Sequence, residues 1–143
     1  MVLPDVNVLV YAFRPDLAPH ALNRRFLLDL LEGDEAFGLS GSVLSGFVRV
    51  VTHPRIFETP DPIEDALAFT ETLRASERAV WIEPGPRHWE IFTRLCREAN
   101  ARGNLVPDAY FAALAIESGC EWVTTDRDYA RFPGLRWSRP EAG

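Results

Sequence analysis

The sequence has no lysine, only two cysteines and three histidines, and no long apolar run among its 143 residues. Cys96 and Cys120 are far apart, and no histidine stands near either at the spacing of a zinc site, which argues against a zinc module. Two such cysteines favour a reduced, cytoplasmic setting. An apolar run of about 18 residues and a cationic leader are both missing, so we expect neither membrane spanning nor export.

The sequence also lacks an excess of positive charge. Its 15 basic residues, all arginines, are outnumbered by 21 acidic residues, which gives a formal net charge of −6. Proteins that coat nucleic acid without regard to sequence normally present a basic surface, so that class is disfavoured. A metal-dependent nuclease remains compatible with this balance, because catalytic carboxylates lower the net charge while cations and local arginines meet the phosphates.

Short apolar runs alternate with longer helical patterns, which predicts an α/β fold of parallel strands joined by crossover helices. The length and the 47% hydrophobic content fit one compact domain over residues 1–138, followed by a short tail over 139–143. The expected strands are Val2–Pro4, Ala36–Leu39, Val80–Ile82, Trp122–Thr124 and Leu135–Trp137. The expected helices are Asn7–Phe13, Pro19–Glu32, Gly41–Thr52, Pro60–Ala75, Pro86–Ala99 and one from Pro107 to Gly119.

Three acids stand where strands end or helices begin. Asp5 and Asp126 follow predicted strands, and Asp108 lies in the first turn of a helix. Carboxyl ends of parallel strands share one edge of a sheet, where ligands gather. Two carboxylates about 4 Å apart repel by roughly 4 kcal/mol at an effective dielectric of 20, and a divalent cation removes that conflict. Hard oxygen ligands favour Mg²⁺ or Mn²⁺.

Each acid also has a purely structural interpretation. Asp5 is suited to capping the helix that follows it, and Asp108 to stabilising a helix dipole. Asp126 and Asp128 are equally suited to capping a short turn. We prefer the metal-binding hypothesis because of the combined placement of these acids.

Four segments, in this order, carry a resemblance to a known family. They are Asp5-Val-Asn-Val-Leu-Val-Tyr-Ala12, Phe47-Val-Arg-Val-Val-Thr-His-Pro-Arg-Ile-Phe57, Val106-Pro-Asp-Ala-Tyr-Phe-Ala-Ala-Leu-Ala115 and Thr124-Thr-Asp-Arg-Asp-Tyr129. The chain resembles the PIN-domain family and, more closely, the VapC-type toxins of bacterial toxin–antitoxin pairs. The resemblance implies a three-layer sandwich around a mainly parallel twisted sheet, and a Mg²⁺-dependent endoribonuclease neutralised by a cognate antitoxin. It also implies an RNA substrate, for which tRNA is one candidate, and a homodimer.

The resemblance assigns roles to six residues. The metal-binding and catalytic acids are Asp5, Asp108 and Asp126, and the supporting residues are Asn7, Thr124 and Asp128. Thr124 fits a Thr-x-Asp pattern of the family, and Asn7 is expected to orient the first acid by hydrogen bonding.

Gly46 departs from the family pattern. Many relatives carry glutamate immediately before the Phe-x-Arg-Val sequence, and no acid occurs from Gly41 through Thr52. Ser42 or Ser45 would supply an oxygen through water but no negative charge. The sequence therefore leaves an alternative open, a noncatalytic or weakened PIN module that binds RNA or protein.

Arginines near the acids are candidates for substrate contact. Arg49 and Arg55 are placed either to face phosphates or, for Arg49, to pair with an acid of the cluster. Arg14, Arg24 and Arg25 are either RNA contacts or exposed helix residues. A third hypothesis, a phosphatase-like hydrolase with Asp5 as nucleophile, is weaker, because Asn7 stands where a second acid is expected and lysine is absent.

Overall fold

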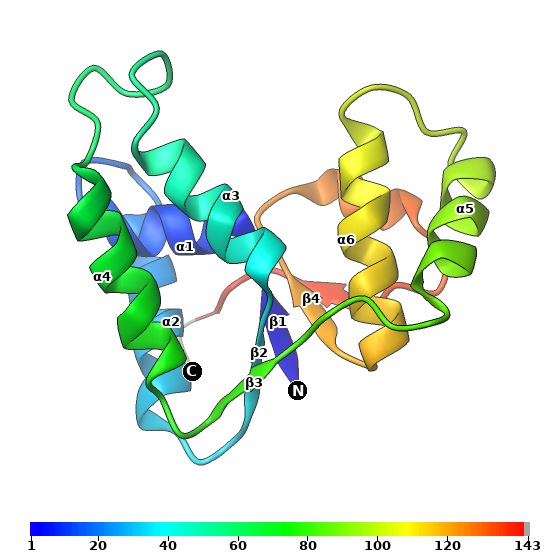
Figure 1. Ribbon diagram of the computed structural model, residues 1–143, viewed down its shortest axis with the longest axis horizontal. Helices are drawn as coiled ribbons and strands as arrows, with labels where there is room; N and C mark the ends of the chain where they lie inside the picture. Colours follow the sequence, from blue (N-terminus) through cyan, green and yellow to red (C-terminus); the bar gives the residue numbers. More distant parts are fainter. Residues whose placement is uncertain (142–143) are drawn as a thin grey trace.

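The computed structural model describes residues 1–141 and contains a five-stranded parallel sheet with helices on both sides (Figure 1). The strands are β1 (Val2–Pro4), β2 (Phe37–Leu39), β3 (Ala79–Trp81), β4 (Glu121–Val123) and β5 (Trp137–Ser138). The helices are α1 (Val6–Phe13), α2 (His20–Glu32), α3 (Gly41–Val51), α4 (Ile63–Arg74), α5 (His88–Glu98) and α6 (Leu105–Ser118). A short 3-10 helix, η1, spans Arg127–Arg131.

The strand order is β3-β2-β1-β4-β5, and every pair is parallel. The chain winds outward from β1 through β2 to β3 and then returns to β4 and β5 on the other side of β1. The winding direction therefore reverses between β1 and β4, and ligands of open parallel sheets bind beyond the carboxyl ends of strands at such a point. The Asp5 N–H donates to the Val123 carbonyl over 2.8 Å, which holds Asp5 at this point.

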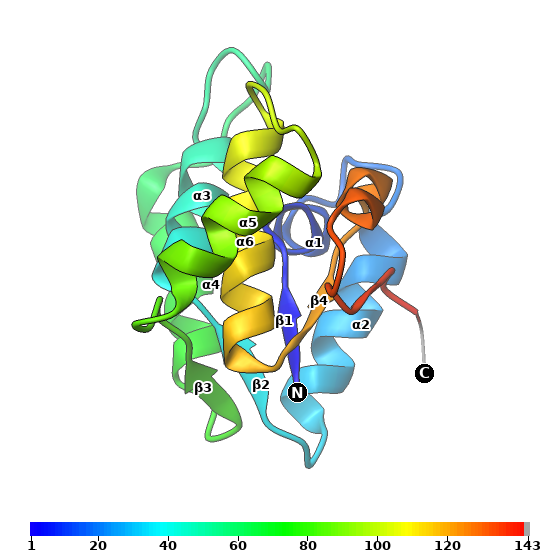
Figure 2. The ribbon, with the colours of Figure 1, turned by 90° about the vertical axis from the view of Figure 1, so that its right-hand side faces the viewer.

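The helices form two layers around the sheet. α1 packs against α2 and α3, α3 packs against α4, and α5 packs against α6. Figure 1 shows α1 to α4 on one side of the strands, and Figure 2 shows α5 and α6 in front of the sheet. The predicted α/β three-layer sandwich is therefore confirmed.

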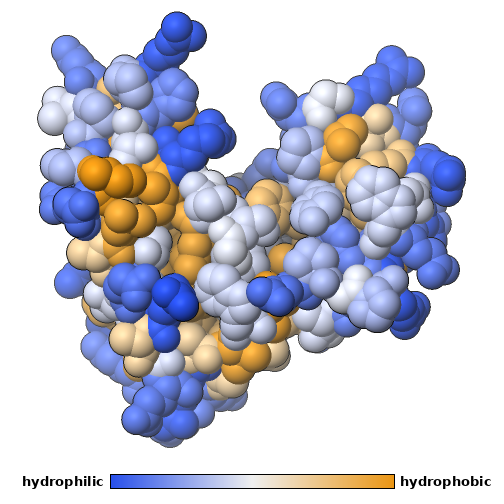
Figure 3. Space-filling view, in the orientation of Figure 1, coloured by the Kyte–Doolittle hydropathy of each residue, from blue (hydrophilic) through white to orange (hydrophobic). Residues whose placement is uncertain are grey.

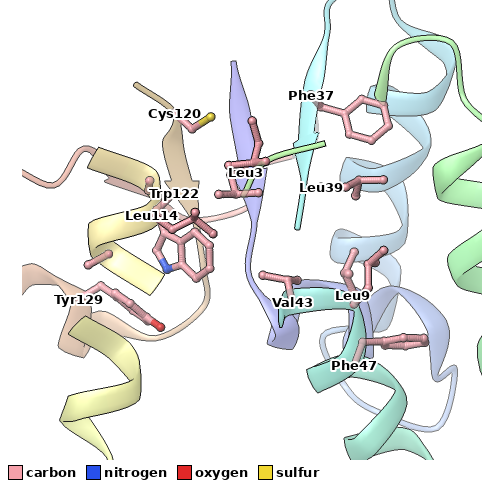
Figure 4. Close-up of a cluster of buried hydrophobic side chains, with 14 of the residues drawn as sticks. Leu3, Leu9, Phe37, Leu39, Val43, Phe47, Leu114, Cys120, Trp122 and Tyr129 are labelled. Carbon is pink, nitrogen blue, oxygen red and sulfur yellow. The ribbon is translucent and has the colours of Figure 1, made fainter. Parts of the chain in front are cut away.

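The hydrophobic core fills both spaces between sheet and helices (Figure 4). Leu3 of β1 lies between the two parts and is fully buried. The first part contains Leu9, Phe37, Leu39, Val43 and Phe47, and the second contains Leu114, Cys120, Trp122 and Tyr129. Because burying one large apolar side chain contributes roughly 1.5–3 kcal/mol, these side chains fix the strand ends against the helices that follow them.

The predicted strands and helices are all present; β1 has the expected bounds, and the other elements have shifted boundaries. α6 begins at Leu105, two residues before the expected Pro107, and this start is compatible with proline because the N–H groups of the first turn have no partner within the helix. β5 begins at Trp137, after a turn in which Gly134 has φ 86°. The expected tail over 139–143 lies partly outside the described residues. Within residues 1–141, no helix has the length and apolar character needed to cross a membrane.

Candidate metal centre

A cavity of about 710 Å³ opens at the carboxyl ends of β1 and β4. Its walls come from α1, α3 and the segment after α3 on one side, and from the start of α6 on the other. Figure 3 shows this face of the molecule hollowed between the half that carries α3 and the half that carries α6. Asp5, Asp108 and Asp126 all line the cavity. Folding thus brings acids from distant parts of the sequence to one place, as we expected.

Asp5 is held on both carboxylate oxygens. It is only 5% exposed, and its Oδ1 accepts a hydrogen bond from the Val6 N–H over 2.6 Å, which caps α1. Its Oδ2 accepts hydrogen bonds from Thr124 Oγ1 over 2.7 Å and from Asn7 Nδ2 over 3.0 Å. Asp5 is therefore a helix cap and a cavity residue at once, and the two interpretations of it are compatible.

Asn7 and Thr124 connect the ends of β1 and β4. The side-chain Oδ1 of Asn7 accepts a hydrogen bond from the Thr125 N–H over 3.1 Å, which directs the side-chain Nδ2 toward Asp5 and Thr124. Thr124 is fully buried, and its hydroxyl also accepts from the Asp126 N–H over 3.1 Å. This network fixes the orientation of Asp5 relative to Asp126, in line with the supporting roles expected for Asn7 and Thr124.

Asp108 lies in the first turn of α6 and is partly buried. Its Oδ1 accepts a hydrogen bond from the Tyr129 hydroxyl over 3.2 Å. The sequence alone indicates no role for Tyr129. Its presence at the end of the Thr124–Tyr129 segment is the one feature of the sequence that draws attention to it. Its proximity to Asp108 depends on how η1 packs on the core.

Asp126 caps η1 by accepting a hydrogen bond from the Asp128 N–H over 2.9 Å. Asp126 also lines the cavity, whereas Asp128 is exposed and is not among the lining residues. The structure therefore places Asp128 at the margin of the candidate site.

The cavity holds more negative charge than its surroundings neutralise. The pKa of Asp5 is raised to about 6, mainly by burial and to a smaller extent by the charges of Asp108 and Asp126, while hydrogen bonds from Thr124 and Val6 oppose the increase. Burial also raises the pKa of Asp108, with the Tyr129 hydrogen bond opposing and the charges of Asp126 and Asp128 adding to the increase. A bound cation would relieve both effects.

Mg²⁺ fits this set of acids. Within residues 1–141, no three side chains of His, Cys, Asp or Glu are arranged closely enough to hold a metal ion together. Mg²⁺ commonly takes only one or two protein carboxylates, while water and substrate phosphate complete its octahedron. The open cavity and its oxygen donors are therefore suited to Mg²⁺ or Mn²⁺ rather than to zinc, which prefers nitrogen and sulfur ligands.

The remaining predicted residues are divided between the cavity and the surface. Gly46 and Arg49 line the cavity. Arg49 is exposed, and within residues 1–141 it forms no ion pair with the clustered acids. Arg55 is exposed and is not a lining residue, and neither is Ser42 or Ser45, so these two serines do not replace the missing acid in this structure.

The fold and the acids at its carboxyl edge define a class of protein. The sequence profile of the PIN domain family matches residues 2–135, so the chain belongs to this family. Ribonuclease VapC43 of Mycobacterium tuberculosis is 46% identical over 143 residues, which cover 100% of this chain and 97% of the relative. Ribonuclease VapC25 of the same organism is 44% identical over 140 residues, with 98% and 99% covered.

A solved structure of similar fold is VapBC2 from Rickettsia felis, bound to a DNA fragment from its promoter. It matches with a TM-score of 0.70 and 20% identity, and the match covers 97% of this chain and 98% of that chain. At this identity the likeness shows the fold, and the full-length VapC relatives show the family.

Proposed function

We propose that this protein is a Mg²⁺-dependent endoribonuclease toxin that hydrolyses RNA phosphodiester bonds and is neutralised by a cognate antitoxin. The observation that carries the proposal is the convergence of Asp5, Asp108 and Asp126 on one cavity in a chain whose full-length relatives are ribonucleases. Mn²⁺ is an alternative cofactor, because it accepts the same oxygen ligands.

The proposed metal-binding acids are Asp5, Asp108 and Asp126, of which one or two would bind Mg²⁺ directly while the rest would act through metal-bound water. Bound Mg²⁺ would orient the scissile phosphate, lower the pKa of an attacking water and offset charge on the leaving oxygen. The chain itself supplies the orientation of the acids. Thr124 and Asn7 hold Asp5, and the Asp126 N–H is tied to the same Thr124 hydroxyl. Such preorganisation matters because small misplacement of a catalytic group is costly to the rate.

The other lining residues fit a nucleotide. Tyr11, Phe57 and Phe111 contribute aromatic surface to the cavity, and aromatic rings accept the faces of unpaired bases. Arg49 stands at the same cavity with a guanidinium group for a phosphate. We therefore propose an RNA substrate that presents an unstacked nucleotide, such as a loop in tRNA.

The acidic cavity also fits the antitoxin. A peptide segment with arginine and apolar side chains would satisfy both the carboxylates and the apolar wall, and would block the site. The similarity in fold to a VapBC complex supports such a partner. A cytoplasmic location and a homodimer complete the proposal, and the free thiols of Cys96 and Cys120 are consistent with a reduced compartment.

Cleavage of cellular RNA by the purified protein tests this function. Mg²⁺ should activate cleavage, EDTA should abolish it, and the product ends should carry 5′-phosphate and 3′-hydroxyl groups. Asp5→Asn and Asp108→Asn should each lower the rate by at least about 100-fold, because each removes charge from the proposed metal ligands. Asp34→Asn is the matched control, since Asp34 is fully exposed in the turn before β2. Unchanged cleavage in both site variants would reject the assignment.

A noncatalytic binding module is the second candidate, because Gly46 stands where many relatives carry an acid. Such a module would bind RNA or antitoxin without turnover, so specific, EDTA-sensitive cleavage would exclude it. Release of phosphate from small esters, with phosphate covalently attached to Asp5, would instead support the phosphatase-like hypothesis.

A further inference from the structure

We propose that Tyr129 is a positioning residue, whose hydroxyl group holds the Asp108 carboxylate in the orientation that the metal ion requires. This inference rests on the proposed function, because it assumes that Asp108 is a metal ligand. It adds to the site a residue that is not itself a ligand and that lies on a different element from Asp108.

The contact between the two residues joins η1 to α6. The Tyr129 hydroxyl donates to Asp108 Oδ1 over 3.2 Å, and both residues line the cavity. Tyr129 is 2% exposed, so its ring belongs to the core while its hydroxyl reaches the cavity. Among residues 1–141 no side chain donates to Oδ2 of Asp108, so this oxygen is the more open of the two to a ligand. Carboxylate ligands of metal ions are usually oriented by such a second hydrogen bond.

Packing fixes the ring that carries this hydroxyl. The Tyr129 ring lies 5.5 Å from the Trp122 ring and 5.9 Å from the Phe132 ring, measured between centroids. Trp122 is fully buried and stacks on Phe111 at 5.4 Å with an interplanar angle of 20°. Figure 4 shows the Tyr129 ring beside Trp122 in the core. Phe111 is three residues after Asp108 on α6, so the hydroxyl and the carboxylate are anchored to the same aromatic cluster.

The two acids at the centre of the cavity are thus oriented by different means. Asp5 receives hydrogen bonds from Thr124, Asn7 and a backbone N–H. Asp108 is only partly buried, and in the described part of the chain Tyr129 is its side-chain donor. Loss of the Tyr129 hydroxyl should therefore affect Asp108 more than any comparable single loss affects Asp5.

Manganese binding by the intact protein tests the inference. We would measure Mn²⁺ affinity by calorimetry for the wild type, Tyr129→Phe, Asp108→Asn and Tyr110→Phe. The control residue Tyr110 packs on His88 and Phe92 and does not line the cavity. Tyr129→Phe should raise the Kd for Mn²⁺ roughly tenfold, as loss of an orienting partner does at other metal sites. Tyr110→Phe should leave the Kd unchanged.

RNA cleavage separates positioning from general structure. With Tyr129→Phe, cleavage should fall at low Mn²⁺ and recover at saturating Mn²⁺, whereas a folding defect would lower it at every concentration. If the wild type binds Mn²⁺ through Asp108 and Tyr129→Phe has the same Kd, the inference is wrong and the proposed function stands. If the wild type shows no Asp108-dependent Mn²⁺ binding, the proposed function itself fails.

A second measurement follows metal binding in the wild type and uses the variants only to assign signals. The chain has three tyrosines, so labelling with 3-fluorotyrosine gives three ¹⁹F signals, which single Tyr→Phe variants assign. Saturating Mg²⁺ should shift the Tyr129 signal and leave the Tyr110 signal in place. An unmoved Tyr129 signal under conditions where Mg²⁺ supports cleavage would overturn the inference.

Discussion

Gly46 of α3 lies directly against Val6 of α1, so that a β-carbon at position 46 would lie 2.9 Å from Val6 Cγ2. Real β-carbons do not approach other atoms so closely. Both residues line the cavity, and Val6 directly follows Asp5. The missing acid at position 46 and the valine at position 6 are therefore matched: a side chain at position 46 would meet Val6 Cγ2, so the Val6 side chain or one of the two helices must shift to admit it.

This contact predicts that substitutions at the two positions are coupled. Gly46→Ala should destabilise the protein by about 1 kcal/mol, because overpacking exceeds the gain in helix propensity. Urea denaturation of Gly46→Ala, Val6→Ala and the double variant should give a coupling energy of about 1–2 kcal/mol in favour of the double variant. Additive changes would show that the two helices move apart freely.

The same pair gives a route to a fourth carboxylate. Val6→Ala combined with Gly46→Glu should fold and bind Mn²⁺ more tightly than Val6→Ala alone, because it adds an acid at the cavity. Gly46→Glu alone should instead be less stable than the double variant. Calorimetry that starts from metal-free protein measures both the Mn²⁺ affinity and the stability. A lower Mn²⁺ affinity in the double variant than in Val6→Ala would contradict the prediction.

The sequence predicted the placement of the acids because local rules govern it. A carboxylate that follows a short apolar strand within a few residues lies near the strand's end, so the positions of Asp5 and Asp126 follow from the strand pattern. The contact between Tyr129 and Asp108 does not follow from the strand pattern, because it depends on how η1 packs against Trp122. The sequence shows that Gly46 departs from the family pattern. The contact with Val6 that explains this departure depends on how α1 and α3 pack, which the sequence does not show.

Arg14 shows the same limit. Its sequence context suggests an RNA contact or an exposed helix residue, and the second interpretation is wrong, since Arg14 is 7% exposed and forms ion pairs with two acids. Its partners are Asp16, only two residues away, and Asp61, which no local pattern connects with it. Partners as distant in the sequence as Asp61 are determined by tertiary structure, so local sequence patterns do not predict them.

Stability without metal should fall as pH rises, because of Asp5. An unfolded aspartate has a pKa near 3.9, whereas burial raises the pKa of Asp5 in the folded protein to about 6. Between about pH 4 and pH 6 the folded state holds a proton that the unfolded state has lost. Stability is therefore greater at the low end of this window and is lost as pH rises through it, by about 3 kcal/mol in full.

Urea denaturation in EDTA from pH 4.5 to 7.5 measures this loss. Asp5→Asn has no titratable group at position 5, so the difference between wild type and variant isolates the Asp5 contribution from that of other groups. Added Mg²⁺ should reverse the trend for the wild type, because it binds the charged form. Parallel pH curves for wild type and Asp5→Asn would show that Asp5 is ionised normally.

Arg14 should stabilise the segment between α3 and α4 that forms part of the cavity wall. Its guanidinium donates to Asp61 Oδ2 over 2.8 Å and to the Thr59 carbonyl over 3.0 Å, and it lies 3.8 Å from the centre of the Phe57 ring. Arg14→Lys keeps the charge but loses this planar set of contacts. We expect a loss of about 2 kcal/mol in unfolding free energy, from hydrogen bonds to charged groups.

Arg25→Lys is the matched control for Arg14→Lys. Arg25 forms an exposed pair with Asp29 on α2, and exposed pairs contribute little. Denaturation should therefore separate the two variants clearly, and hydrogen exchange should increase at residues 56–61 in Arg14→Lys alone. Equal stability of the two variants would mean that the Arg14 contacts are not made in solution.

Arg49 should contact RNA phosphate, whereas Arg55 should not. Arg49 lines the cavity and is exposed, and Arg55 is exposed but is not a lining residue. Arg49→Ala should raise the KM for RNA several-fold. It should also reduce the magnitude of the slope of log binding constant against log salt concentration by about 1, as loss of one phosphate contact does. The affinity of Arg49→Ala for Mn²⁺ should not fall, because the substitution removes a positive charge. Arg55→Ala should match the wild type in KM and in salt dependence. If instead Arg55→Ala raised the KM and Arg49→Ala did not, RNA would bind along the turn that follows α3 and not in the cavity.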